Sequence, residues 1–222
     1  MRFDGRLVAE LTSDDIQALF ADVVEEDESI DYKSQPYGGQ TPDSKSRVEL
    51  CCDIVAFANN GLGYIIIGIA EADKKPVKLC TIGNPAPYIE SIRKTSMDGI
   101  EPPVIGLEVG AIQMPNREYV IVIRIPPSEF TPHMVKLHHS THFCRRYGDD
   151  KREMTYSQIK GLFIDDANAL RLAQMDAKLD MLIEQGAPSP APPAPTENAN
   201  TTADPNRIRE IMELRMREIA DQ

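Results

Sequence analysis

Four charged residues near the start of the chain have the types and spacing that divalent-metal chemistry needs. Glu26, Glu28 and Asp31 precede Lys33 within one short segment. Carboxylate oxygens are the ligands that Mg²⁺ prefers, usually one or two of them together with waters and substrate phosphate. A nearby lysine would offset the negative charge that develops during phosphodiester cleavage. The segment is therefore a candidate metal-dependent cleavage site for Mg²⁺ or Mn²⁺. The alternative is an acidic helix end beside one exposed strand.

A second candidate is the basic stretch between residues 133 and 152. The stretch contains only two acids, Asp149 and Asp150, although the formal net charge of the chain is −11. Lysine and arginine contact phosphate whatever the base sequence, and such binding weakens as salt rises. We therefore expect a local nucleic-acid surface here, against the alternative of a solvated hairpin with ordinary surface charges. The cations are Lys136, Arg145, Arg146, Lys151 and Arg152.

The same stretch contains histidines and a cysteine at spacings that raise the question of zinc. Strand alternation would place His138, His142 and Cys144 on one face. The C-x2-C and H-x3-H spacings of structural zinc are missing, and we expect Cys51 and Cys52 in a core helix. We therefore expect neither zinc nor a disulfide framework, and a reducing cytoplasm is the expected location.

The segment from Arg47 to Ala70 is expected to form the core of the domain. Its first half repeats apolar residues at helical spacing, and Ser44 or Ser46 is expected to cap this helix. Its second half, Tyr64 to Ile69, is a short β-branched run that predicts a buried central strand.

Between these halves lies a loop of small polar residues that leaves backbone amides at one corner. Asn59, Asn60, Gly61 and Gly63 tolerate the left-handed conformation that ends a helix. The G-x4-G-K-(S/T) spacing of a triphosphate-binding loop is missing. We expect a structural turn, with nucleotide (ATP) binding as the alternative.

Other elements follow from local patterns. A helix is expected over Leu11 to Val24, capped by Thr12 or Ser13. Strands are expected at Ser29 to Lys33 and at Val77 to Leu79. A hairpin is expected from Val104–Gln113 and Glu118–Ile125, after a helix over Asn84 to Met97. The last two expected elements are a strand over Ser140 to Tyr147 and a helix capped at Thr155.

Three blocks also resemble the Schlafen and AlbA-type family of nucleic-acid-binding domains. AFANNGLGYIIIGI is similar to the AFANT-x-GG-x-(I/L/F)-x-IGV signature, with Leu62 in place of a glycine. Glu26 to Lys33 resembles E-x4-(E/D)-(F/Y)-K. VIVIRIPPSEFTPHMV and FCRRYGDDKREMTYSQI resemble the blocks that follow. The resemblance covers roughly residues 25 to 163, and blocks in the right order make chance agreement improbable.

The resemblance implies an α+β fold, a mixed β-sheet covered by helices, and an active site built on acids and a lysine. Carried to this sequence, it implies Glu26, Asp31 and Lys33 as catalytic residues. Glu71 is the nearest third acid, one place after the family's position at Ala70. Glu26, Asp31 and Glu71 would then hold the metal. The implied activity is endonucleolytic cleavage, of RNA rather than DNA. A non-catalytic DNA-binding regulator is the alternative.

The rest of the chain is expected to serve assembly. We expect a domain over 1–165, a helical extension over 166–185, a disordered Pro/Ala-rich linker over 186–204 and an amphipathic helix over 205–222. The seam of Leu172, Met175, Leu179 and Leu182 suits another helix. A homo-oligomer is expected, and the last helix is expected to dock on this chain, a second copy or another protein. No membrane span or signal peptide is expected.

Overall fold

The computed structural model describes residues 3, 5–39, 41–137, 140–164, 174–175 and 178. The chain divides into two units, Met1–Met175 and Asp176–Gln222. The extension after Ile164, the linker and the last helix lie outside the described residues, apart from Gln174, Met175 and Lys178, as do His138 and His139. Among the described residues, no helix combines the length and apolarity needed to cross a membrane.

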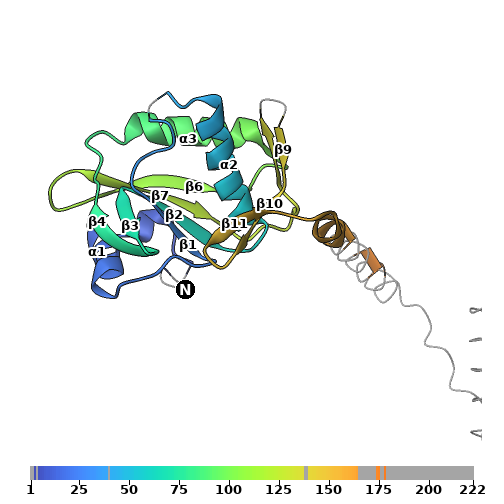
Figure 1. The fold of residues 1–222 in the computed structure, drawn as a ribbon, viewed down its shortest axis with the longest axis horizontal. Helices are drawn as coiled ribbons and strands as arrows, with labels where there is room; N and C mark the ends of the chain where they lie inside the picture. The colour runs from blue at the N-terminus through green and yellow to red at the C-terminus, as the bar shows by residue number, and fades with distance from the viewer. Residues whose placement is uncertain are drawn as a thin grey trace, which may run out of the picture. The chain divides into compact units, whose positions relative to one another are not determined.

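The first unit is built on a four-stranded mixed sheet in the order β1-β2-β7-β6 (Figure 1). β1 runs parallel to β2, whereas β7 pairs antiparallel with both β2 and β6. β2 is buried at every position, as expected for a central strand. The mixed sheet with helices on it confirms the expected α+β fold. The strands are β1 (Ile30–Lys33), β2 (Gly63–Ile67), β6 (Glu108–Gln113) and β7 (Tyr119–Ile125).

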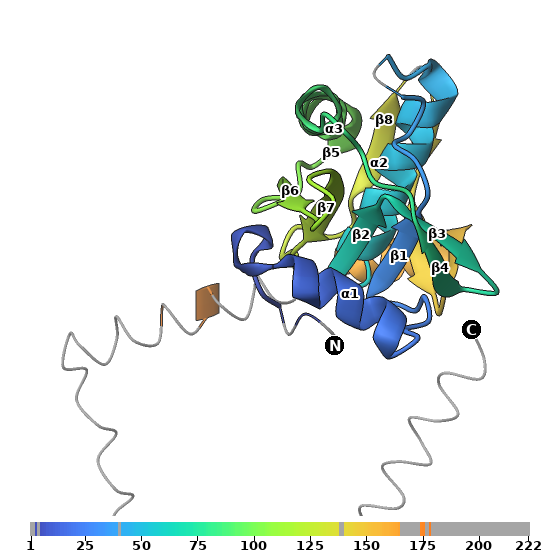
Figure 2. The same cartoon turned by 90° about the vertical axis from the view of Figure 1, so that its left-hand side faces the viewer.

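Helices cover both faces of this sheet (Figure 2). α2 (Ser44–Ala58) and α3 (Ala86–Gly99) lie on one face, where Ile65 and Ile67 of β2 enter their apolar cluster. The 3-10 turn Val8–Glu10 and α1 (Ser13–Ala21) contribute to the opposite face, together with Tyr64 and Ile66. Strand alternation divides the β2 side chains between two separate cores.

The helix and strand expected over Arg47 to Ala70 are present, with two differences. Asp43 caps α2 by accepting from the Ser46 amide at 2.8 Å, so the prediction that Ser44 or Ser46 caps it is wrong. The strand expected to reach Ile69 ends at Ile67, because Gly68 takes a φ of 111° that redirects the chain. A separate hairpin follows, β3 (Ile69–Ala72) with β4 (Lys75–Leu79).

The later elements also follow the sequence with shifted bounds. The expected β6–β7 hairpin is confirmed, although β6 begins at Glu108 rather than Val104. The single strand expected over Ser140 to Tyr147 is two strands, because its halves pair with different partners. The first half, β9 (Ser140–His142), pairs with β8 (Met134–Leu137). The second half, β10 (Cys144–Tyr147), pairs with β11 (Asp150–Glu153). β8 also pairs with β5 (Ile100–Glu101).

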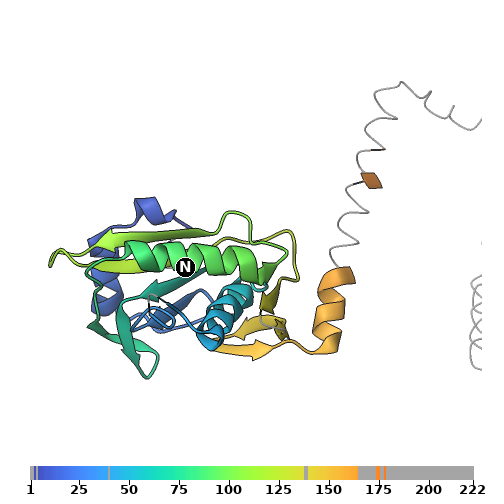
Figure 3. The same cartoon turned by 90° about the horizontal axis from the view of Figure 1, so that it is seen from above.

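A helix over 156–164 follows β11, as Figure 3 shows. Its expected cap is confirmed. The Thr155 hydroxyl accepts from the Gln158 amide at 3.4 Å, and the Gln158 side chain accepts from the Thr155 amide at 2.8 Å.

Candidate functional site

A buried ion-pair network joins β1 to the β10–β11 hairpin. Asp31 and Lys33 share one face of β1 and form an ion pair. The other oxygen of Asp31 accepts from Arg146 Nη1 at 3.1 Å. Arg146 is 2% exposed, and its guanidinium lies 4.5 Å from the centre of the Phe57 ring. Although expected to contact nucleic acid, Arg146 here neutralises a buried acid.

Asp53 of α2 is the second acid of this network and the residue that the sequence reasoning missed. It is 3% exposed, forms an ion pair with Lys151 and accepts from the Tyr37 hydroxyl at 2.6 Å. Lys33 Nζ lies 3.9 Å from Asp53 Oδ2, the oxygen that accepts from Tyr37. Burial raises the pKa of Tyr37 well above its ordinary value, and the charge of Asp53 adds to this. The available signal was an acid within the apolar run Cys51 to Ala58.

The four residues expected to be catalytic influence one another electrostatically. Burial raises the pKa of Glu26, the bond from the Tyr32 amide (2.6 Å) lowers it, and the charges of Asp31 and Glu71 raise it further. Burial would lower the pKa of Lys33, but Asp53 and Asp31 outweigh it, so the pKa is raised. Glu71 accepts from the Lys74 amide at 2.8 Å. Glu26 therefore lies near enough to Asp31, Lys33 and Glu71 to feel the charge of each.

A divalent ion at these residues would have to displace a cation that Asp31 already contacts. Both oxygens of Asp31 already contact cations, Lys33 and Arg146. Among the residues that the structure describes, no group of three or more His, Cys, Asp or Glu could hold a metal ion. The site of Glu26, Asp31 and Glu71 for Mg²⁺ or Mn²⁺ therefore stays a prediction. His142, one of the residues considered for zinc, pairs with Glu153 at 2.5 Å.

The basic residues fall into an inner and an outer set. Arg146 and Lys151 are directly opposed in the hairpin, and both point toward the buried acids Asp31 and Asp53. Arg145 and Arg152 are opposed in the next register position, so they share the other face. Lys136 lies outside the hairpin on β8 and pairs with Glu101 at 3.0 Å.

We call the face with Arg145 and Arg152 the outer face of the hairpin; Tyr147 and Asp150 complete it. Arg145 Nε donates to the side-chain oxygen of Asn60 at 3.2 Å. Arg152 is 65% exposed at its side chain and pairs with Asp150 at 2.8 Å. The loop residue Asn60 therefore orients one arginine of the outer face.

The remaining loop residues serve the turn itself. The amides of Asn59, Asn60 and Gly61 donate to the carbonyls of Val55 and Phe57, at 2.8 to 2.9 Å, so the end of α2 uses them. A Cβ added at Gly63 would lie 2.0 Å from the Phe57 ring. This geometry agrees with a structural turn, and nucleotide binding at the loop stays a prediction.

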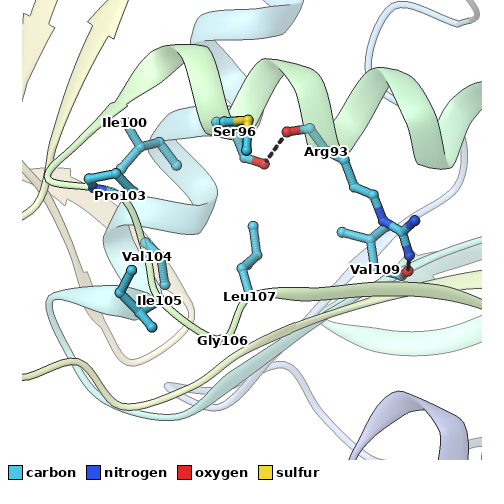
Figure 4. A pocket seen from close by; sticks show the side chains of 10 residues that line it. Arg93, Ser96, Ile100, Pro103, Val104, Ile105, Gly106, Leu107 and Val109 are labelled. Atoms are coloured by element: carbon cyan, nitrogen blue, oxygen red, sulfur yellow. Dashed lines mark hydrogen bonds between the residues drawn. The ribbon is translucent and has the colours of Figure 1, made fainter.

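A separate apolar pocket of about 360 Å³ lies between α3 and the segment before β6 (Figure 4). Ile100, Val104 and Leu107 contribute to its wall. Arg93 lines it too, but its guanidinium donates to the Val109 carbonyl at 2.6 Å. The pocket shares no lining residue with the ion-pair network.

Comparisons with known proteins give a family and a distant likeness to solved structures. A family model described as Schlafen, AlbA_2 matches residues 26–155, which is more than half of the chain. The search of curated proteins gave no match. A solved structure, the DIP2311 protein of Corynebacterium diphtheriae, is 16% identical with a TM-score of 0.42. The match covers 63% of this chain and 25% of that one, so this chain spans about a quarter of that protein's length.

Proposed function

Because this chain belongs to the Schlafen, AlbA_2 family, we propose that it binds nucleic acid through the outer face of the β10–β11 hairpin. Family membership suggests a nucleic-acid-binding or nuclease-like function. The outer face is the surface that we propose for this contact. Its arginines suit phosphate, whereas the chain as a whole is strongly acidic. A small basic surface would allow a chain with a net charge of −11 to bind nucleic acid at one place.

The observation that carries this proposal is the direct opposition of Arg145 and Arg152. Like charges directly opposite each other across an antiparallel pair are destabilising. A phosphate group between them would remove this repulsion and accept charge-assisted hydrogen bonds from both guanidinium groups. The partner that Arg145 has is a neutral amide, Asn60, which orients the side chain without cancelling its charge.

The inner face of the hairpin supports the same proposal. Arg146 and Lys151 pair with buried acids on β1 and α2, so they hold the hairpin against the domain. A fixed hairpin presents Arg145 and Arg152 at a constant spacing, which lowers the entropy cost of binding. Lys136, from β8, would extend the phosphate surface.

The test is the affinity of the full chain for fluorescently labelled RNA and DNA of unrelated sequences, measured by anisotropy over a range of salt. The variant Arg145→Glu/Arg152→Glu should weaken binding similarly for every sequence, because phosphate contacts carry no sequence information. The slope of log affinity against log salt should fall by about 0.7–0.9 for each lost contact.

Lys78→Glu/Lys94→Glu is the matched control, since it makes the same change in net charge at two exposed residues outside the hairpin. Retained affinity in this control, together with loss in the arginine variant, supports the surface. Equal affinities of the arginine variant and the unaltered chain would show that the hairpin makes no contact.

A second candidate function is cleavage of the bound strand at Glu26, Asp31, Lys33 and Glu71. The observation in its favour is their mutual influence on the pKa values of Glu26 and Lys33, since perturbed titratable groups gather at active sites. RNA is the substrate class that we expect, with Mg²⁺ or Mn²⁺ required.

A further inference from the structure

A second pocket, of about 430 Å³, lies where α2 meets the β10–β11 hairpin. Two cysteines from distant parts of the chain line it, Cys52 of α2 and Cys144 of β10. Lys45, His142, Lys151 and Glu153 are also in its wall. Glu49 and Arg152 complete its charged lining, so the pocket combines a pair of free thiols with a border of both charges in which cations are in slight excess.

The two thiols line the same pocket and lie close enough to influence each other's pKa. The Cys144 thiol donates a hydrogen bond to the sulfur of Cys52, and this bond lowers the pKa of Cys52 while raising that of Cys144. Burial opposes the lowering at Cys52, and the charges of Lys151 and His142 favour it. Cys52 is also the more exposed of the two thiols, at 8% against 3%, which agrees with Cys52 as the attacking sulfur and Cys144 as the proton donor.

Cys51 shows that this environment is specific to the pocket. It precedes Cys52 directly, but its thiol faces α3 and donates to the Thr95 carbonyl at 3.5 Å. Burial raises the pKa of Cys51 to about 12. The adjacent Cys51–Cys52 pair thus consists of one core thiol and one pocket thiol.

We propose that Cys52 and Cys144 form a redox site that reacts with small-molecule disulfides. The Cys52 thiolate attacks one sulfur of the disulfide, forms a mixed disulfide and releases the other half as a thiolate. Cys144 then attacks the Cys52 sulfur, so the second half departs as a thiol carrying the Cys144 proton. The protein loses two electrons and the small disulfide gains them.

The size and border of the pocket agree with such a reagent. Its volume falls within the range of small-molecule sites. Cys52 and Cys144 are 8% and 3% exposed, so reagents reach them only through the pocket. Lys45, Lys151 and Arg152 would attract a carboxylate-bearing reagent such as glutathione disulfide. Arg152 also belongs to the outer face of the hairpin, but Cys52 and Cys144 do not, so the cysteine variants test this proposal independently of nucleic-acid binding.

The experiment treats the full chain with glutathione disulfide, blocks remaining thiols by alkylation and maps the cysteines by peptide mass spectrometry. The expected product is a Cys52–Cys144 disulfide, with Cys51 unmodified. In Cys144→Ser the reaction should stop at a glutathione adduct on Cys52. Cys52→Ser should leave Cys144 reduced, and Cys80→Ser, outside the pocket, should react as the unaltered chain does.

Alkylation rates of the unaltered chain give a second measurement that needs no variant. Cys52 should react faster with iodoacetamide than Cys51, and unfolding in urea should remove the difference. A glutathione adduct on Cys51 or Cys80 in preference to Cys52 would overturn the proposal. The same holds if Cys144→Ser gives no adduct while denatured chain does.

Discussion

The side chain of Asn59 makes both hydrogen bonds to the backbone of His133 that a neighbouring strand would make. Its oxygen accepts from the His133 amide at 2.7 Å, and its nitrogen donates to the His133 carbonyl at 2.9 Å. The same nitrogen donates to the Cys144 carbonyl at 3.0 Å. One buried side chain thus joins the end of α2 to the segments before β8 and at β10.

Asn59→Ala should therefore destabilise the fold strongly. It leaves one amide and two carbonyls buried without this partner, and each such group costs roughly 1–3 kcal/mol. Urea unfolding of the full chain should show a loss of about 3 kcal/mol or more. Asn60→Ala is the control, because it removes only the bond to Arg145 and should cost about 1 kcal/mol or less. Equal losses in the two variants would contradict this role.

Replacing Asp53, the buried acid that the sequence reasoning missed, should also lower the stability of the fold. Asp53→Asn leaves Lys151 without its buried anion, and breaking a buried pair from one side typically costs about 3–5 kcal/mol. The double variant Asp53→Asn/Lys151→Met removes both charges, keeps an oxygen that can accept from the Tyr37 hydroxyl, and should recover much of the loss. Denaturant midpoints of the single and double variants decide this. A double variant that is less stable than Asp53→Asn would show that the ion pair is not the main cause.

The cleavage hypothesis has its own test. Asp31→Asn should abolish cleavage of structured RNA in Mg²⁺ or Mn²⁺ while leaving RNA affinity nearly intact. Because Asp31 also neutralises Arg146, circular dichroism must first show that the variant is folded. Glu71→Gln, at an exposed residue, gives a second variant with little structural risk. Cleavage that survives both substitutions, or an excess of chelator, would remove this hypothesis.

Lowering the pH should decrease the stability of the fold, because His133 is buried in its neutral form. The Pro102 carbonyl can only accept, so Nδ1 donates to it at 2.7 Å, and Nε2 accepts from the Ser128 hydroxyl at 2.7 Å. Burial lowers the pKa of His133 below 6.5, although the Pro102 bond opposes this. The unfolded chain therefore binds the proton first, and stability is complete above pH 6.5 and declines below it.

The measurement is urea unfolding at pH values above and below 6.5. His133→Gln should be less sensitive to pH than the unaltered chain. His142→Gln removes a partly exposed histidine paired with Glu153 and serves as the control. Equal pH sensitivity in His133→Gln and the unaltered chain would assign the effect to other groups.

Assembly is a further prediction. The outer face of one hairpin is small for a long nucleic acid, and a twofold dimer would double it. Light scattering of the full chain should give a dimer. A chain ending at Ala167 tests whether the expected helices beyond it carry the interface. A monomer in both measurements would exclude the dimer.

Local patterns predicted the elements better than the directions of their side chains. The helix-to-strand core, the β6–β7 hairpin and the Thr155 cap could be predicted because their signals lie within a few residues. The break of the strand at Phe143 could not, because β9 and β10 differ in their pairing partners rather than in composition.

For the ion-pair network, too, local patterns could not predict contacts between distant parts of the chain. Spacing grouped Asp31 with Lys33 correctly on one face of β1. Whether Arg145 or Arg146 points inward depends on how β10 lies on α2, a long-range contact with no local signal. Asp53 lay within an apolar run and was missed because its cations, Lys33 and Lys151, come from distant strands.

The sequence distance between Asp31 and Arg146, 115 residues, also sets an order of events during synthesis. At about 5–20 residues per second, a ribosome needs roughly 6–23 s to make Arg146 after Asp31. During that time β1 and α2 exist while their buried acids have no hairpin cations. A nascent chain that stops before Arg146 could form much of its sheet, but its two interior acids, Asp31 and Asp53, would have to share the single cation Lys33. Such truncated products should remain open to chaperones and proteases, and the hairpin is the segment that completes the domain.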